Sequence, residues 1–234
     1  MPPFNSEKIR RAAMYAFDQK AFLEGVIGDS RYYQTCDAMF VCGTPLESAA
    51  GMDGLVRGNF ARSRELLKEA GYDGTPIVML HTTDIAVLTN AGPIAKDLLE
   101  KGGFKVEMVP LDFQAIVSRR LRKTPANDGG WNGFMTSWLS VDMMNPLTNS
   151  MVNASCEKAN FGWPCDVEVE KLRDAFARAP DPESRRKIAA DLQARAVAYG
   201  THIHLGQYTL PTASRRLRGI VTSPIPVFWN IEKQ

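Results

Sequence analysis

The segment Pro76–Thr82, PIVMLHT, begins the part of the chain that decides the fold. Its apolar run is typical of a strand buried inside a sheet. Residues 90–101 then have helical spacing, and residues 104–109 alternate apolar and polar side chains as a strand does. These three segments predict a β-α-β unit.

A second helix and a third strand extend this unit. Asp112 is placed to cap a helix over the following residues, and residues 133–138, GFMTSW, return to a strand pattern. Strands and helices that alternate with short connections predict an α/β fold with a doubly wound, mainly parallel sheet flanked by helices. Right-handed crossovers would bring the loops at 82–90, 110–112 and 138–146 to one edge, where such sheets bind ligands.

The last of these loops contains the residues best suited to hold a ligand. Trp138 can stack on a flat group, and Asp142 can pair with a cation. Ser140 lies between these two residues and Asn145 follows them. These four are the candidate ligand-binding residues. The alternative interpretation is a core tryptophan followed by an aspartate that caps a helix.

The other elements expected from the sequence are helices over 5–24, 59–70, 166–179 and 182–199 and a strand over 203–210. Residues 25–58 have no clear period, and so long a loop is usually functional or tied down. The tail from Ile220 to Glu232 is apolar and β-like, with Pro224 and Pro226 interrupting it. Such a tail is expected to pair with something outside this core.

Composition excludes several classes of protein. A net charge of +2 is too small to indicate nucleic-acid binding, so we interpret the runs 119–123 and 215–218 as solvated basic faces. Membrane insertion is not expected, because apolar runs fall short of the about 20 residues that a spanning helix needs. The start of the chain lacks a signal peptide, so the sequence is either cytosolic or a mature or excised piece.

Enzyme and metal chemistry also lack support. The chain has none of the common nucleophile, phosphate-loop, zinc-protease or dinucleotide motifs, so we predict that it is not an enzyme and uses no cofactor. His202 and His204 would share a face of a strand, but no third metal ligand lies nearby in the sequence.

The four cysteines form two close pairs in loops, Cys36 with Cys42 and Cys156 with Cys165. An even count in such stretches favours disulfides and an oxidising compartment. Four cysteines allow three connectivities, of which we favour local pairing.

Five stretches, taken in order, resemble the second half of a family 5 extracellular solute-binding protein, the peptide- and nickel-type receptors of ABC importers. They are Pro2–Asp18, Ala61–Tyr72, Asp97–Glu107, Trp138–Pro146 and Ser155–Cys165. The last of them is similar to a cysteine-bridged loop of dipeptide-binding members.

This resemblance implies a periplasmic-binding-protein-like lobe of a two-lobed receptor that closes over its ligand without catalysis. Residues 1–204 would form the second lobe, and residues 205–234 would be a hinge or return segment that completes an absent first lobe. The signal peptide would then lie upstream, the location would be periplasmic, and the full receptor would deliver its solute to ABC permease subunits. Asp142 matches the aspartate that pairs with a peptide's α-ammonium, and Trp138 matches a tryptophan of the pocket wall.

The chain departs from the family pattern in two places. Asn145 replaces an aspartate before Pro146, and one extra residue separates Trp138 from that proline. The loop Thr83–Ala86 also lacks the arginine with which dipeptide receptors hold a carboxylate. A longer peptide or another cationic or amphipathic solute therefore fits as well as a dipeptide. The alternative function is a sensing or interaction domain of a regulator that reuses the same lobe.

Overall fold

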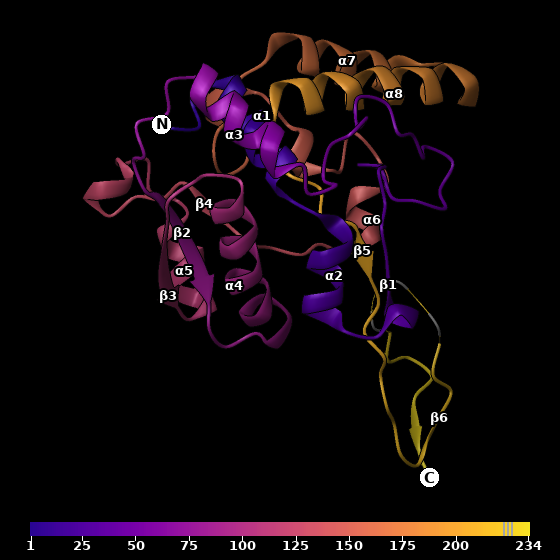
Figure 1. Ribbon diagram of the computed structural model, residues 1–234. Helices are drawn as coiled ribbons and strands as arrows, with labels where there is room; N and C mark the ends of the chain where they lie inside the picture. The colour runs from indigo at the N-terminus through magenta and orange to yellow at the C-terminus, as the bar shows by residue number, and fades with distance from the viewer. Residues whose placement is uncertain (222, 224, 226) are drawn as a thin grey trace.

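The structure, a computed structural model, describes residues 1–221, 223, 225 and 227–234 (Figure 1). Its helices and strands are, in chain order, α1 (Glu7–Ala16), α2 (Gln19–Ile27), β1 (Tyr33–Gln34), α3 (Phe60–Glu69), β2 (Ile77–Thr82), α4 (Ala86–Lys101), β3 (Val106–Leu111), α5 (Phe113–Arg119), β4 (Gly133–Phe134), α6 (Ser140–Met143), α7 (Val167–Arg178), α8 (Pro182–Tyr199), β5 (Gln207–Tyr208), β6 (Leu217–Arg218) and β7 (Glu232–Lys233). Short 3₁₀ helices are η1 (Ser30–Tyr32), η2 (Ala126–Asp128), η3 (Ser150–Val152) and η4 (Cys156–Lys158).

A parallel sheet of order β3-β2-β4 confirms the predicted α/β core. Every residue of the central strand β2 is buried, as its apolar sequence predicts. The chain steps from β2 to β3 in one direction and from β3 to β4 in the other, so right-handed crossovers place α4 and α5 on opposite faces. The sheet is therefore doubly wound, although β4 ends at Phe134 rather than at the expected Trp138.

The predicted helix over residues 5–24 is wrong in one respect, because it is two helices that part at Phe17 and Asp18. The Asp18 carboxylate caps α2 by accepting from the N–H of Ala21 at 3.0 Å. The Phe17 carbonyl accepts from the N–H of Gly58 at 2.9 Å, and the Gln19 N–H donates to the Val56 carbonyl at 3.0 Å. Residues 56–58 therefore bond to the Phe17 carbonyl and the Gln19 N–H, two backbone groups that a continuous helix would use for its own hydrogen bonds.

Three helix starts confirm the predicted caps. Asn59 accepts from the N–H of Arg62 at 3.0 Å, and Asp112 accepts from the N–H of Ala115 at 2.7 Å. Asp181 accepts from the N–H of Ser184 at 2.8 Å, with Pro182 in the first turn of α8. Gly200 ends α8 with φ of 78°, a left-handed conformation that glycine adopts without strain. Helix α1 packs against α3, and α7 packs against α8.

The long loop after α2 is part of the core rather than a flap. Met39, Phe40, Leu55 and Val56 are each 0–1% exposed and belong to the same hydrophobic cluster as α1, α4, β2 and α8. The Cys36–Cys42 disulfide closes its first part. The loop is therefore tied down, one of the two outcomes expected from its length.

The C-terminal segment leaves this body. β5 pairs with β1, and β6 and β7 form an antiparallel hairpin that projects away from the helices in Figure 1. The expected strand over 203–210 is reduced to Gln207–Tyr208. The predicted interruptions at Pro224 and Pro226 fall outside the described residues. Phe228 and Trp229 are 73% and 90% exposed, so the tail has little apolar cover in this chain.

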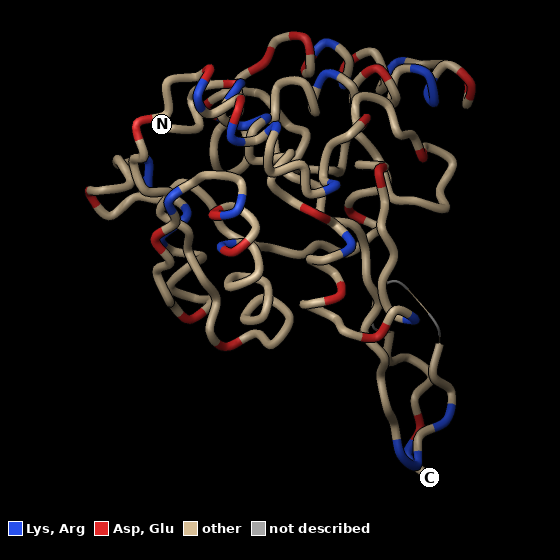
Figure 2. Tube along the Cα trace, viewed as in Figure 1, with Lys and Arg blue, Asp and Glu red and all other residues tan. Residues whose placement is uncertain are grey.

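Charged residues of both signs are interspersed along the helices (Figure 2). Within the described residues, none of the helices is long and apolar enough to span a membrane.

Candidate functional site

The stretch from Trp138 to Leu147 exposes a group of large apolar side chains. Trp138 is 43% exposed, and Leu139, Val141, Met144 and Leu147 are exposed by 39% to 47%. Trp138 is therefore not the core residue of the alternative interpretation. Grouped apolar exposure of this kind is typical of a surface that contacts a ligand or another domain.

Asp142 lies in this stretch on the one-turn helix α6. The N-cap of α6 is Leu139, which makes no side-chain cap bond, so Asp142 does not cap this helix. Among the described residues its carboxylate has no hydrogen-bond or ion-pair partner within ordinary contact distance. Ser140, the first residue of α6, is exposed beside it.

Asn145 has a structural part in the turn that follows. Its Oδ1 accepts from the N–H of Leu147 at 2.8 Å, and its carbonyl accepts from the N–H of Asn149 at 2.8 Å. The buried Pro146 presents its carbonyl to Nε of Arg173 on α7 at 3.1 Å. The candidate stretch is thus anchored at its C-terminal end by a side-chain turn and a contact with α7.

Two of the three loops predicted at one sheet edge meet directly. The N–H of Thr83 donates to the Leu111 carbonyl at 3.0 Å, and Asp84 accepts from the N–H of Phe113 at 2.9 Å. The third loop leaves the parallel strand β4 and continues to α6.

The basic run 119–123 is only partly the solvated face expected from the sequence, because Arg122 and Lys123 are exposed whereas Nε of Arg119 and Nε of Arg120 are buried. The Arg120 guanidinium lies over the ring of Phe161 at 4.2 Å, and Nζ of Lys123 lies over the ring of Trp163 at 4.8 Å. Burial lowers the pKa of Arg120. The run therefore fastens the end of α5 to the loop that carries Cys156 and Cys165. The aromatic residues at 161 and 163 are the only signal in the sequence that could have suggested this contact.

The cysteines pair locally, as favoured from the sequence. The structure contains the disulfides Cys36–Cys42 and Cys156–Cys165. Both disulfides close short loops. The pattern fits an oxidising compartment.

The histidines of the last segment are half-buried, and their Nε2 atoms are enclosed rather than exposed for metal binding. Nε2 of His202 and Nε2 of His204 are both buried without a hydrogen-bond partner in the described chain. Burial lowers the pKa of His202 to about 3 and that of His204 to about 4. Within the described residues, no three His, Cys, Asp or Glu side chains are grouped to hold a metal ion.

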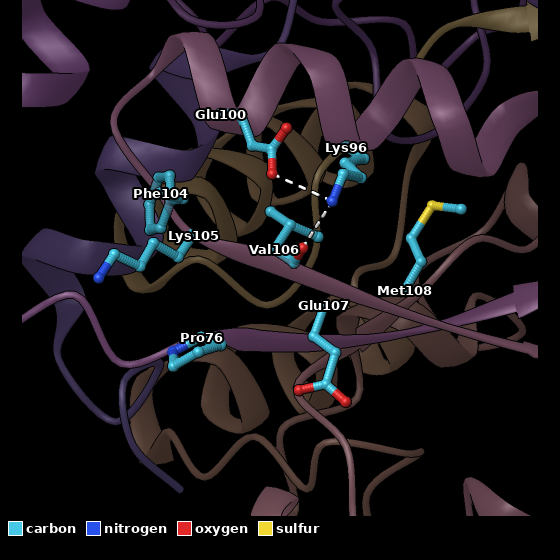
Figure 3. A pocket seen from close by; sticks show the side chains of 8 residues that line it. All are labelled: Pro76, Lys96, Glu100, Phe104, Lys105, Val106, Glu107 and Met108. Atoms are coloured by element: carbon cyan, nitrogen blue, oxygen red, sulfur yellow. Dashed lines mark hydrogen bonds and ion pairs between the residues drawn. The ribbon is translucent and has the colours of Figure 1, made fainter.

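A groove of about 660 Å³ lies beside the edge strand β3, and its lining includes no residue of the candidate stretch (Figure 3). Lys96 pairs with Glu100 at 3.1 Å and donates to the Val106 carbonyl at 2.8 Å. The lysine thereby occupies a carbonyl that an added strand would use, which protects the edge.

Comparison with known proteins places this architecture among binding-protein folds. Residues 1–161 match the family described as "Bacterial extracellular solute-binding proteins, family 5 Middle". The chain is 32% identical over 234 residues to the "Probable peptide ABC transporter periplasmic-binding protein y4tO" of Sinorhizobium fredii. That match covers 99% of this chain and 44% of the relative, so the chain spans less than half the length of this curated relative.

Solved structures share the fold at low sequence identity. A substrate-binding protein of Listeria monocytogenes, CtaP, superposes with a TM-score of 0.75 at 14% identity, covering 88% of this chain and 41% of that protein. A dipeptide-binding protein of Pseudoalteromonas sp. SM9913, solved with Met-Leu, gives a TM-score of 0.74 at 16% identity, covering 100% of this chain and 46% of that protein.

Proposed function

Because this chain belongs to the family 5 bacterial extracellular solute-binding proteins, we propose that it is one lobe of a two-lobed receptor that captures a peptide or similar small solute for an ABC importer. The observation that carries the proposal is the 32% identity to a peptide-type periplasmic-binding protein over nearly all of this chain but only 44% of the relative. A receptor of that length has room for a second lobe.

In this proposal residues 1–204 are the ligand-binding lobe and residues 205–234 return to the other lobe. The projecting β6–β7 hairpin supports this division, because Phe228 and Trp229 expose apolar surface that a neighbouring lobe could cover. Closure about the hinge would trap the ligand between the lobes, and the closed form would be delivered to the permease.

Trp138, Ser140, Asp142 and Asn145 are the proposed ligand contacts. The exposed apolar side chains around Trp138 offer a wall for an amphipathic solute, and the free carboxylate of Asp142 offers a partner for an α-ammonium group. Asn145 contributes mainly by shaping the turn, since its Oδ1 already accepts from Leu147.

We place the receptor in the periplasm, where its two disulfides would persist. Titration of native protein with a thiol reagent checks this location. The proposal expects no reactive thiols, and four reactive thiols would contradict it.

Calorimetry with a peptide panel tests the function itself, using this chain and a receptor chain that carries both lobes. We expect binding by the two-lobed receptor and weak or undetectable binding by this chain, because one lobe lacks half of the pocket wall. Submicromolar binding by this chain alone would contradict the shared pocket.

Asp142 gives a sharper version of the same test. The variant Asp142→Asn should weaken binding of a peptide with a free α-ammonium by about tenfold or more, the size of a lost charge-assisted hydrogen bond. It should leave the affinity of the N-acetylated peptide unchanged. Asp191→Asn, at an exposed position on α8, is the matched control and should change neither affinity. Equal losses for both peptides would remove Asp142 from the site.

A further inference from the structure

Helix α6 is short and has no buried residue to hold it in position. It has four residues, too few for a helix that is stable alone. Its neighbours Trp138, Leu139 and Met144 are exposed, so burial of these side chains contributes little to its position. The position of α6 therefore depends on the contacts at its C-terminal end.

Asn149 makes the most buried of these contacts. The residue is 0% exposed, and its Nδ2 donates to the carbonyl of Met143 at 3.4 Å and to the carbonyl of Met39 at 3.2 Å. Its Oδ1 accepts from the N–H of Met151 at 3.0 Å. Both amide protons are thus used, one for α6 and one for the loop closed by Cys36–Cys42.

The loop end of this link is itself fixed. Met39 is 1% exposed, and its backbone N–H donates to Oε1 of Gln193 on α8 at 2.9 Å. Met39 is therefore held on one side by α8 and on the other by Asn149. The loop closed by Cys36–Cys42 thus supports α6 through Asn149.

We propose that Asn149 is a positioning residue that holds the segment Trp138–Pro146 on the Cys36–Cys42 loop, so that the proposed ligand contacts are ordered before a ligand arrives. This proposal rests on the proposed function for the identity of the contacts. Supporting residues that lock contact residues in place are what an ordered binding site requires.

Hydrogen exchange of the unliganded chain tests the proposal without any ligand. Asn149→Asp keeps the shape and the acceptor for Met151, but it places a carboxylate oxygen against the carbonyls of Met39 and Met143. Asn153→Asp is the matched control, because Oδ1 of Asn153 only accepts, from the N–H of Ser155 at 3.0 Å, and a carboxylate keeps that bond.

Amide exchange over residues 138–147 should accelerate by about tenfold in Asn149→Asp, as expected for losing buried hydrogen bonds, and should not change in Asn153→Asp. Exchange over α4 and α8 should be unchanged in both variants. Unchanged exchange over 138–147, or a uniform increase that includes α4 and α8, would overturn the positioning role.

If Asn149→Asp does not fold, a second variant tests the same proposal. Cys36→Ser with Cys42→Ser opens the loop that carries Met39 and should accelerate exchange over 138–147 in the same way. Cys156→Ser with Cys165→Ser, which opens the other disulfide loop, is its control and should leave that segment unchanged. Equal rates of amide exchange over residues 138–147 in the two double variants would contradict the role of the Cys36–Cys42 loop.

Affinity measured in the two-lobed receptor separates this proposal from the proposed function. Asn149→Asp should weaken peptide binding by about tenfold while the Asn153→Asp receptor binds normally. Absence of peptide binding by the unmodified receptor would contradict the proposed function, and the exchange experiment would still decide the role of Asn149.

Discussion

Oε1 of Gln193 accepts a 2.9 Å hydrogen bond from the backbone N–H of Met39, which lies 154 residues earlier in the chain. The Nε2 atom of the same side chain donates to the carbonyls of Asp37 at 3.0 Å and Ser48 at 2.7 Å. Gln193 is 0% exposed. One buried amide thus holds Asp37, Met39 and Ser48 of the loop after α2 against α8.

Replacing Gln193 with leucine should destabilise the chain by about 2 kcal/mol or more, because buried backbone groups lose their partners. Chemical denaturation followed by circular dichroism measures this loss. Gln114→Leu, at an exposed position on α5, is the control and should change the free energy of unfolding by less than about 0.5 kcal/mol. Similar losses in the two variants would contradict a special role for the buried amide.

The two disulfides should differ in their resistance to reduction. Cys36 is 2% exposed, whereas Cys165 is exposed and Cys156 is half-buried. A reducing thiolate must reach a sulfur atom, so Cys156–Cys165 should open first under mild dithiothreitol. Alkylation at timed intervals and mass spectrometry of the peptides would show the order. Earlier labelling of Cys36 and Cys42 would mean that the loop opens more easily than its burial indicates.

Local signals in the sequence predicted much of the fold. The apolar run of β2 and the caps Asn59, Asp112 and Asp181 each act through residues a few positions away, and each is found where expected. The split between α1 and α2 was missed, because the competing bonds to Phe17 and Gln19 come from residues 56–58. A helix pattern cannot show a competitor that distant.

In the candidate site, too, local signals were visible in the sequence and contacts with distant residues were not. The sequence singled out Trp138 and Asp142; the structure leaves Trp138 43% exposed and shows that Asp142 does not cap α6, while their role toward a ligand stays a prediction. Asn149 gave no signal, because a buried asparagine differs from a turn-forming one only by partners far along the chain. Arg120 was misinterpreted for a similar reason, since its aromatic partner Phe161 lies in another loop.

His202 and His204, whose Nε2 atoms are buried, should make the chain sensitive to mild acid. Burial, and then the neighbouring His204, lower the pKa of His202 to about 3, and burial lowers that of His204 to about 4 although nearby Asp37 raises it. An unfolded histidine titrates near 6.5, so the unfolded state binds more protons below that pH. The free energy of unfolding should therefore fall by up to about 1.4 kcal/mol per histidine per pH unit as pH drops from 6.5 toward the folded values.

Denaturation between pH 7 and pH 4.5 isolates this effect, because most carboxylates stay ionised there. Single variants His202→Gln and His204→Gln should each have a flatter dependence of stability on pH than the unmodified chain. His81→Gln is the control. Burial also lowers the pKa of His81, but its loss leaves the other two histidines in place, so most of the slope should remain. An unchanged slope in both test variants would show that their rings are reached by water in solution.

Asp166 should contribute more to stability than an ordinary helix cap. It is 8% exposed, accepts from the N–H of Val169 at 2.8 Å, and accepts from Nε of Arg195 on α8 at 3.2 Å. Asp166→Ala should cost about 2 kcal/mol, since it removes a cap and leaves Arg195 without this carboxylate. Asp181→Ala removes an exposed cap alone and should cost about 1 kcal/mol.

The pH dependence of the Asp166→Ala variant separates the ion pair from simple packing. Hydrogen bonding to Arg195 lowers the pKa of Asp166 in the folded chain, so its contribution is present above the unfolded pKa near 3.9 and is lost as pH falls through the folded value. The difference in unfolding free energy between the unmodified chain and Asp166→Ala should therefore shrink as the pH is lowered below about 4. A difference that stays constant down to pH 2 would show that the side chain acts through packing, because packing does not depend on its charge.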